Sequence, residues 1–186
     1  APESSRLGTG GADGTVRLWD ADGRGDPVMP CEEKVHSVAC APDGSLIATS
    51  LADATVRLWD AATLEPVRVL RKAVGRVSHV AFSPDGEGIA GGCEDGTVQV
   101  WTVATGKRRA WLKPHDRRVY SVDFSPDGTL LATAAEDRSA RIWDLRGDTA
   151  RGDPLRHGRR VFSATFSPDG AYLATACEDR TARLWW

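Results

Sequence analysis

Residues 136–144 read EDRSARIWD, and this pattern of an acidic turn followed by an alternating run to tryptophan recurs along the chain. Its other copies are ADGTVRLWD at 12–20, LADATVRLWD at 51–60, EDGTVQVW at 94–101 and EDRTARLWW at 178–186. The five tryptophans are separated by 40, 42, 42 and 42 residues. A period in the low forties is the length of one four-stranded blade of a β-propeller. The repeat therefore predicts a series of small sheets.

A second phrase keeps the same period: CAPDGSLIAT at 40–49, FSPDGEGIAG at 82–91, FSPDGTLLAT at 124–133 and FSPDGAYLAT at 166–175. Proline presets φ and glycine accepts a positive φ, so Pro-Asp-Gly between apolar runs predicts a hairpin. In the third full repeat we expect strands at roughly 108–112, 119–124, 129–134 and 139–144. Apolar residues nowhere keep a sustained helical spacing, so the fold class is all-β.

The 186 residues fit a single domain. We divide it into a partial repeat at about 1–20 and full repeats at 21–60, 61–102, 103–144 and 145–186. The partial repeat has predicted strands only near 7–11 and 15–19.

Over residues 7–186 this unit is similar to the WD40 repeat, which combines such a hairpin with an aspartate six residues before the tryptophan. That aspartate is present in every copy, as Asp13, Asp53, Asp95, Asp137 and Asp179. The Trp-Asp dipeptide is present at 19–20, 59–60 and 143–144, and is replaced at 101–102 and 185–186. The resemblance implies WD40-type β-propeller blades, which are four-stranded antiparallel sheets arranged radially, in about four and a half repeats.

In WD40 packing the outermost strand of a blade comes from the start of the next repeat. The resemblance then implies three complete blades, a leading blade without its innermost strand and a last blade without its outermost strand. Rings of this family commonly have about seven blades, so we expect the C-terminal portion of a larger propeller or repeat array. A small ring of about five blades, closed on itself or by another chain, stays open as the alternative, since exposed strand edges invite pairing.

The resemblance also implies a hydrogen-bonded group of histidine, threonine, aspartate and tryptophan inside a blade. The third full repeat offers His115, Thr133, Asp137 and Trp143, and the fourth offers His157, Thr175, Asp179 and Trp185. A buried carboxylate needs donors, an imidazole N–H supplies one, and the threonine hydroxyl can link the imidazole to the indole N–H.

The earlier repeats depart from this set. Cys31 replaces the histidine of the first full repeat, and Ala73 and Gly91 replace the histidine and threonine of the second. We therefore expect stiffer blades towards the C-terminus.

A basic residue precedes the first valine of each predicted innermost strand, and a polar or aromatic residue follows that valine. In the family these positions lie on the top face, at the mouth of the central channel. We predict a partner-binding row there, formed by Lys34, His36, Arg76, Arg118, Tyr120, Arg160 and Phe162. Arginine can grip a carboxylate with two parallel bonds, and aromatic anchors beside arginine are typical of interface hot spots. The alternative is a solvated rim in which Glu94, Glu136 and Glu178 pair with the basic row.

The overall composition argues against several classes of function. A net charge of −2 and a pI of about 6.1 give no pull towards nucleic acid or anionic membrane. No apolar run approaches the ~18 residues of a membrane span, and no signal-peptide pattern is present, so we expect a cytoplasmic protein. The cysteines are scattered without a C-x-x-C pair, which predicts reduced core thiols and no metal site: Cys31, Cys40, Cys93 and Cys177.

We expect no catalytic residue and no cofactor, because the sequence has neither a phosphate-binding glycine loop nor an H-E-x-x-H pair. The favoured function is a non-enzymatic scaffold or recognition domain that binds a protein or peptide on the top face. The alternative is a sensor or regulatory domain of a larger bacterial signalling protein, a kinase or a nucleotide-driven switch. The excess of arginine over lysine and the many alanines are a compositional association with a bacterial source. An enzyme or a nucleic-acid binder is less favoured.

Overall fold

The computed structural model describes residues 7–19, 22, 25–70 and 75–186. This part of the chain folds into five antiparallel sheets and contains no helix, which confirms the all-β prediction. Accordingly, none of the described residues forms a helix of the length and apolarity that crossing a bilayer requires.

Each sheet is formed by strands that follow one another in the chain. The first has the order β1 (Leu7–Gly10), β2 (Thr15–Trp19), β3 (Gly25–Pro30). The second has the order β4 (Val35–Cys40), β5 (Leu46–Leu51), β6 (Val56–Asp60), β7 (Pro66–Leu70). The third has the order β8 (Val77–Phe82), β9 (Gly88–Cys93), β10 (Val98–Thr102), β11 (Arg108–Leu112).

The fourth sheet contains β12 (Val119–Phe124), β13 (Leu130–Ala135) and β14 (Ser139–Asp144), with β15 (Thr149–Ala150) and β16 (Leu155–Arg156) beside β14. The fifth contains β17 (Val161–Phe166), β18 (Leu173–Cys177) and β19 (Ala182–Trp185). The strands of the third full repeat agree with the predicted ranges to within one residue.

The Pro-Asp-Gly hairpins close by one mechanism in the four full repeats. The aspartate accepts a hydrogen bond at 2.9–3.0 Å from the backbone N–H two residues later, and the glycine adopts a φ of 69–74°. Such an Asx turn followed by a left-handed glycine reverses the chain in the space of two residues. The sequence signal for these hairpins therefore has a direct structural cause.

The outer edge of the fourth sheet departs from the pattern. Two short strands, β15 and β16, take the place that β7 and β11 fill in the sheets before it. Gly152, with a φ of 75°, and Pro154, which has no N–H, lie between them. Neither residue suits a regular ladder, so the strand is interrupted there.

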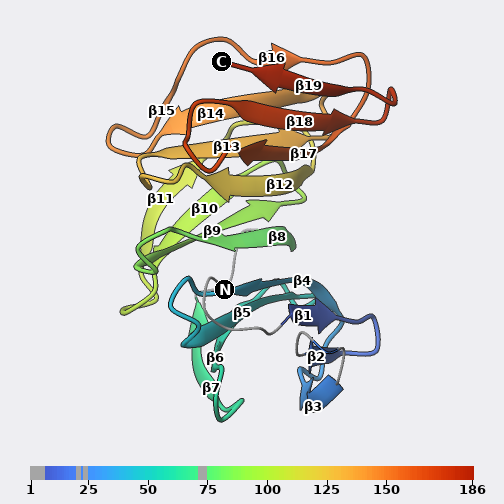
Figure 1. Ribbon diagram of the computed structural model, residues 1–186, viewed down its shortest axis with the longest axis vertical. Coiled ribbons are helices and arrows are strands. Elements are labelled where there is room, and N and C mark those ends of the chain that lie inside the picture. The colour runs from blue at the N-terminus through green and yellow to red at the C-terminus, as the bar shows by residue number, and fades with distance from the viewer. Residues whose placement is uncertain (1–6, 20–21, 23–24, 71–74) are drawn as a thin grey trace.

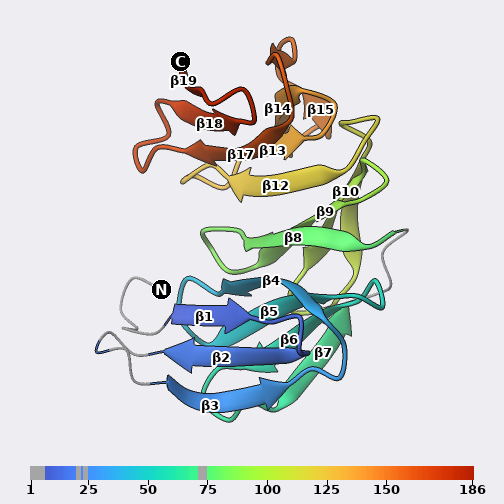
Figure 2. The same cartoon turned by 90° about the vertical axis from the view of Figure 1, so that its right-hand side faces the viewer.

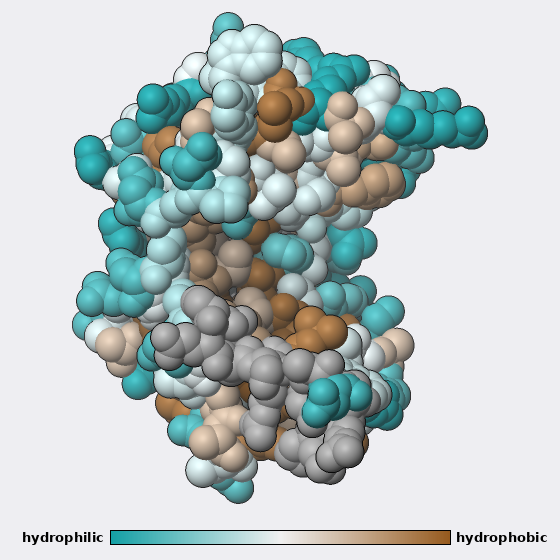
Figure 3. Space-filling view, viewed as in Figure 1, coloured by the Kyte–Doolittle hydropathy of each residue, from teal (hydrophilic) through white to brown (hydrophobic). Residues whose placement is uncertain are grey.

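The sheets stack side by side through their first strands. Val80 N–H donates to Ser37 Oγ at 3.3 Å, which joins β8 to β4, and Phe166 N–H donates to Asp123 Oδ2 at 2.8 Å, which joins β17 to β12. Apolar side chains fill the space between neighbouring sheets, as where Val100 packs with Val119 and Val122. Figures 1 and 2 show the resulting arc, with the first and last sheets at opposite ends, so the described residues form no closed ring. Figure 3 shows apolar side chains gathered in a hollow at the middle of the molecule.

Candidate functional site

One end of the sheets carries the predicted basic row. Three backbone bonds of 2.9 Å join this row to the acidic turns: Glu94 N–H to the Arg76 carbonyl, Glu136 N–H to Arg118 and Glu178 N–H to Arg160. A fourth joins Ala52 N–H to the Lys34 carbonyl at 2.9 Å. The basic residues and the acidic turns thus share one surface, here called the top face. The Pro-Asp-Gly hairpins lie at the other end of the strands.

Two cations of the row are engaged by glutamates. Arg160 contacts Glu136 at 3.2 Å and Glu178 at 4.0 Å. Arg118 contacts Glu94 at 3.7 Å and donates from Nε to Ser78 Oγ at 3.0 Å. All these charged side chains are at least partly exposed, so each pair contributes only about 0–1 kcal/mol. In this part of the row the ion-paired rim is the observed arrangement.

The other two cations differ. Lys34 and Arg76 are exposed, and within the described part of the chain neither forms an ion pair. Burial lowers the pKa of nearby His36, and the charges of Lys34, Arg118 and Arg76 lower it further against the opposing charge of Glu94. His36 Nε2 is buried without a hydrogen-bond partner among the described residues. The first half of the row is therefore a region of positive potential around a neutral imidazole.

The second half carries the aromatic residues. Tyr120 and Phe162 come from β12 and β17, and their ring centroids lie 5.4 Å apart at an interplanar angle of 58°. The guanidinium carbon of Arg118 lies 5.4 Å from the centroid of the Tyr120 ring. Phe162 keeps 47% of its surface exposed. The structure thus brings together three of the predicted partner-binding residues as an aromatic pair with a cation over one ring.

A polar cavity of about 660 Å³ opens beside this cluster, between the top-face loops of the fourth and fifth sheets. It is lined by charged residues of both signs, among them Arg117, Arg159, Arg160, Asp116, Glu136 and Glu178. Arg138 lines it as well. The sequence did not predict Asp116 and Arg138 as site residues, because they lie outside the repeated positions around the valines.

The predicted network of the third full repeat forms in part. His115 Nδ1 lies 2.8 Å from Asp137 Oδ2, and His115 Nε2 lies 2.8 Å from Thr133 Oγ1. Burial raises the pKa of the Asp137 carboxyl, but the bond and charge of His115 and the bonds from Ser139 outweigh it and hold that pKa at about 2. Trp143 Nε1 is buried without a partner among the described residues, so the expected link from threonine to indole is absent.

Ser139 is a member of this network that the sequence analysis missed. Its Oγ donates to Asp137 Oδ1 at 2.7 Å and lies 3.3 Å from His115 Nδ1. The three residue types resemble a catalytic triad. However, Ser139 is only 2% exposed, and its hydroxyl donates to the carboxylate of Asp137. In a catalytic triad the serine hydroxyl instead donates to the histidine that acts as its base, so this group has a structural arrangement.

The network of the fourth full repeat lacks a different hydrogen bond, the one between histidine and aspartate. Thr175 Oγ1 accepts from Trp185 Nε1 at 2.9 Å and lies 3.1 Å from His157 Nε2. Asp179 instead contacts Thr181 and, at 3.4 Å, Arg183. His157 Nδ1 is buried without a partner among the described residues. The expected bond from His157 to Asp179 is therefore not formed.

In the earlier repeats the tryptophan bond persists without histidine. Trp59 Nε1 donates to Thr49 Oγ1 at 3.0 Å, and Trp19 Nε1 donates to Thr9 Oγ1 at 2.8 Å. At Gly91 an added Cβ would lie 2.9 Å from the Trp101 ring, so the tryptophan fills the space of the missing threonine. Ala73 lies outside the described residues.

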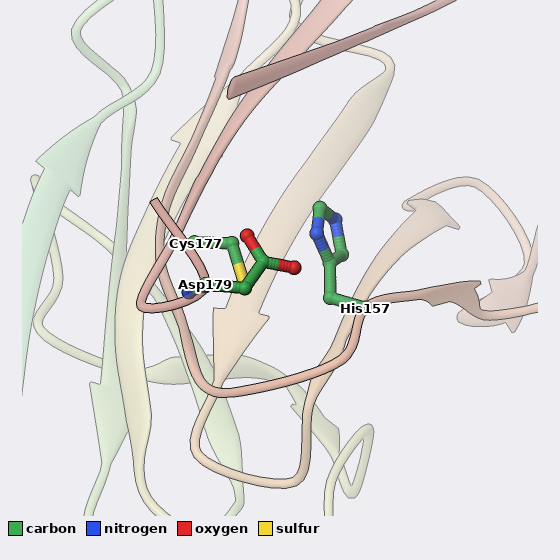
Figure 4. A group of neighbouring side chains, drawn as sticks. All are labelled: His157, Cys177 and Asp179. Carbon is green, nitrogen blue, oxygen red and sulfur yellow. Dashed lines mark hydrogen bonds between the residues drawn. The ribbon is translucent and has the colours of Figure 1, made fainter. Parts of the chain in front are cut away.

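The cysteines are free thiols, and Cys31, in the histidine position of its repeat, is buried. Cys177 has charged and basic neighbours: its sulfur, one nitrogen of His157 and one carboxylate oxygen of Asp179 all lie within 4.8 Å of one another. Figure 4 shows a ring nitrogen of His157 facing the carboxylate of Asp179, with Cys177 beside Asp179. The sequence has no C-x-x-C pair, which predicted no metal site, and this group has no such spacing. Its sequence signal is Cys-x-Asp with a histidine 20 residues upstream.

Comparison with protein-family models gives a match to the family described as WD domain, G-beta repeat. The match covers most of the chain in five segments, residues 1–20, 27–60, 64–102, 106–144 and 154–185. Comparison with curated proteins gives no match.

Proposed function

This chain belongs to the WD40 family, and from that premise we propose that it is a non-enzymatic scaffold that binds a protein or peptide on its top face. WD40 domains are generally protein-interaction scaffolds. The observation that carries the proposal is the exposed pair of Tyr120 and Phe162 with Arg118 over the tyrosine ring.

The aromatic pair supplies an anchor. Tyr120 and Phe162 lie on neighbouring blades and their rings pack against each other. The two side chains therefore lose little conformational freedom when a ligand covers them. Rigid aromatic residues beside arginine are the side chains most often found at hot spots. An apolar side chain of the ligand laid on Phe162 removes water from a surface that is half exposed in the free chain.

The cations of the basic row indicate a second feature of the ligand, an acidic group. Arg118 and Arg160 are already engaged by glutamates, so an incoming carboxylate has to displace a partner there. Lys34 and Arg76 have no such partner among the described residues, and their charges converge on His36. The ligand that fits is a peptide with an apolar residue for the aromatic pair and an acidic group for Lys34 and Arg76.

The test is selection from a random peptide display library on the immobilised chain. We expect the enriched peptides to combine an aromatic or aliphatic residue with Asp or Glu. Phe162→Ala and the pair Lys34→Glu and Arg76→Glu should each weaken their binding at least 10-fold, about 1.4 kcal/mol. Arg118→Glu and Arg160→Glu should weaken binding less.

Two substitutions at the opposite end of the sheets are matched controls. Tyr172 is 42% exposed beside a Pro-Asp-Gly hairpin, and Lys107 is an exposed cation in the turn after β10. Tyr172→Ala and Lys107→Glu should leave the selected peptides bound. If the Phe162→Ala chain binds those peptides as tightly as the original chain, the top-face proposal is wrong.

A further inference from the structure

We propose that His157, Cys177 and Asp179 form a binding site for a divalent transition-metal ion, with zinc as the best-fitting ion. His157 lies in the loop before β17, Cys177 ends β18, and Asp179 follows in the turn to β19. Their ligand atoms lie within 4.8 Å of one another, and Figure 4 shows a ring nitrogen of His157 directed at the carboxylate of Asp179. The set combines one soft sulfur, one imidazole nitrogen and one carboxylate oxygen, which are the ligand types of zinc sites.

The unpartnered nitrogen of His157 is the observation that points to a ligand. His157 is 92% buried, and its Nδ1 has no hydrogen-bond partner among the described residues. The other nitrogen, Nε2, lies 3.1 Å from Thr175 Oγ1. A buried polar atom without a partner is costly, and buried polar groups of native proteins are almost always satisfied. A metal ion at Nδ1 satisfies it.

Thr175 allows His157 to present a lone pair at Nδ1. The threonine hydroxyl can donate to the carbonyl oxygen of Arg183 at 3.5 Å, and its oxygen then accepts from both Trp185 Nε1 and His157 Nε2. In that arrangement the imidazole proton is on Nε2 and every contact of the hydroxyl is kept. The bond from Nε2 to Thr175 is then the outer-shell support that a metal-bound histidine normally has.

The third repeat shows that the fold does not require this arrangement. There His115 Nδ1 donates to Asp137 at 2.8 Å, so it has no free lone pair, and Ala135 occupies the position of Cys177. The second repeat has Cys93 at that position, but its sequence has no histidine to match His157. Only the fourth full repeat has histidine, cysteine and aspartate at the three positions of His157, Cys177 and Asp179.

The sulfur and the carboxylate are already oriented by the turn. Asp179 N–H donates to Cys177 Sγ at 3.5 Å, and the thiol donates to the carbonyl oxygen of Arg159 at 3.5 Å. Asp179 Oδ1 accepts from Thr181, while Oδ2 has only a 3.4 Å contact with Arg183. When zinc binds, the thiol proton passes to solvent, a Zn–S bond forms, and the thiolate and carboxylate neutralise the ion.

The dimensions require only a small closure. Zinc bonds of about 2.0–2.3 Å in a tetrahedron place the ligand atoms roughly 3.3–3.7 Å apart. The present spread of up to 4.8 Å is therefore too wide by about 1–1.5 Å, which side-chain rotation can supply. The Asp179 side chain is 19% exposed, so solvent can provide the fourth ligand. Calcium and magnesium prefer sites made only of oxygen, and the sulfur disfavours them.

The experiment measures binding of zinc and cobalt(II) to the reduced full chain by competition with a chromophoric chelator and by absorption spectroscopy. We expect one zinc per chain and, with cobalt, a thiolate-to-metal charge-transfer band. Cys177→Ala reproduces the residue of the third repeat and should weaken zinc binding at least about 100-fold, since even loss of outer-shell partners costs 10–100-fold. The cobalt band should disappear.

Cys93→Ala is the matched control, because Cys93 has the same strand position in a repeat without the histidine. It should leave zinc affinity and the cobalt band unchanged. Thr175→Val should weaken zinc binding by roughly 10–100-fold while Thr175→Ser does not. Circular dichroism without metal confirms that each variant is folded. Absence of zinc binding at micromolar concentration, or equal binding by the Cys177→Ala chain, overturns the proposal.

Discussion

Replacing Asp137 by alanine should destabilise the protein more than the same replacement of Asp95. Both aspartates occupy the same position of the repeat and make the same local turn. Asp95 Oδ1 accepts from Thr97 N–H at 3.0 Å and from Thr97 Oγ at 2.6 Å. Asp137 Oδ1 accepts from Ser139 N–H at 3.0 Å and from Ser139 Oγ at 2.7 Å. Only Asp137 also bonds a histidine, His115, at 2.8 Å.

The difference between the two substitutions therefore measures the bond from His115 to Asp137. A hydrogen bond to a charged group contributes about 1.5–3 kcal/mol. The His115 side chain is fully buried, so water does not replace the lost carboxylate. Asp95 is exposed and bonds no histidine, so Asp95→Ala removes only the turn bonds that Asp137→Ala also removes. We expect Asp137→Ala to cost about 1.5–3 kcal/mol more than Asp95→Ala.

Urea unfolding followed by tryptophan fluorescence measures this difference. With a slope of about 2 kcal/mol/M, the midpoint of the Asp137→Ala chain should lie about 0.8–1.5 M below that of the Asp95→Ala chain. Repeat arrays can unfold unit by unit, so amide exchange of β13 and β9 provides the local values. Equal midpoints together with equal exchange rates in the two strands would show that the histidine bond contributes nothing to stability.

Three further predictions concern other sites. Burial lowers the pKa of His79 below 6.5 against the opposing charge of Asp123, and Val122 N–H donates to its Nδ1 at 3.4 Å. Stability from His79 should be complete above about pH 6.5 and decline as the pH falls below that value, because the unfolded chain then binds the extra proton. His79→Gln should flatten the pH profile of unfolding on this acid side. An added Cβ at Gly92 would lie 2.6 Å from Val119 Cγ1 and 3.1 Å from Val122 Cγ1. Gly92→Ala should cost about 1–3 kcal/mol in thermal denaturation. Val122→Ala in the double variant should recover only part of this cost, because the closer contact, with Val119, remains. Trp59→Phe should cost about 0.5–1.5 kcal/mol more than Trp143→Phe in urea unfolding, because only Trp59 has an indole hydrogen bond to lose, and the opposite order would contradict the assigned bonds.

The architecture could be predicted from the sequence because its determinants are local and repeated. The Asp-Gly turns and the alternation before each tryptophan depend on residues two to six positions apart, so the strands of the third full repeat fall within one residue of the predicted ranges. The division of the outer strand into β15 and β16 was not predicted. Its cause, Gly152 and Pro154, is visible in the sequence but breaks the period that the analysis followed.

The sequence predicted which basic residues lie on the top face, but it did not predict which ion pairs they form. Period alone placed Arg118 and Arg160 beside the acidic turns, but which glutamate each contacts depends on side-chain rotamers. Arg118 also turns towards Ser78 of the neighbouring sheet, a contact across 40 residues. The cluster of Cys177 was missed for a related reason. Its members come from a loop, a strand end and a turn, and no fixed short spacing marks them.

The two histidine networks differ in whether a carboxylate bonds Nδ1 of the histidine. In the third repeat the carboxylate of Asp137 takes the proton of His115 Nδ1, so Nε2 must accept and Thr133 must donate to it. In the fourth repeat no carboxylate bonds His157, and Thr175 is free to donate to the Arg183 carbonyl while it accepts from Trp185. The same four residue types thus join histidine to aspartate in one blade without the indole bond, and join threonine to the indole in the next blade with an imidazole nitrogen left unpartnered. Identical residue types in two repeats therefore do not imply identical chemistry, because the placement of the aspartate carboxylate decides whether the histidine keeps an unpartnered nitrogen for a ligand.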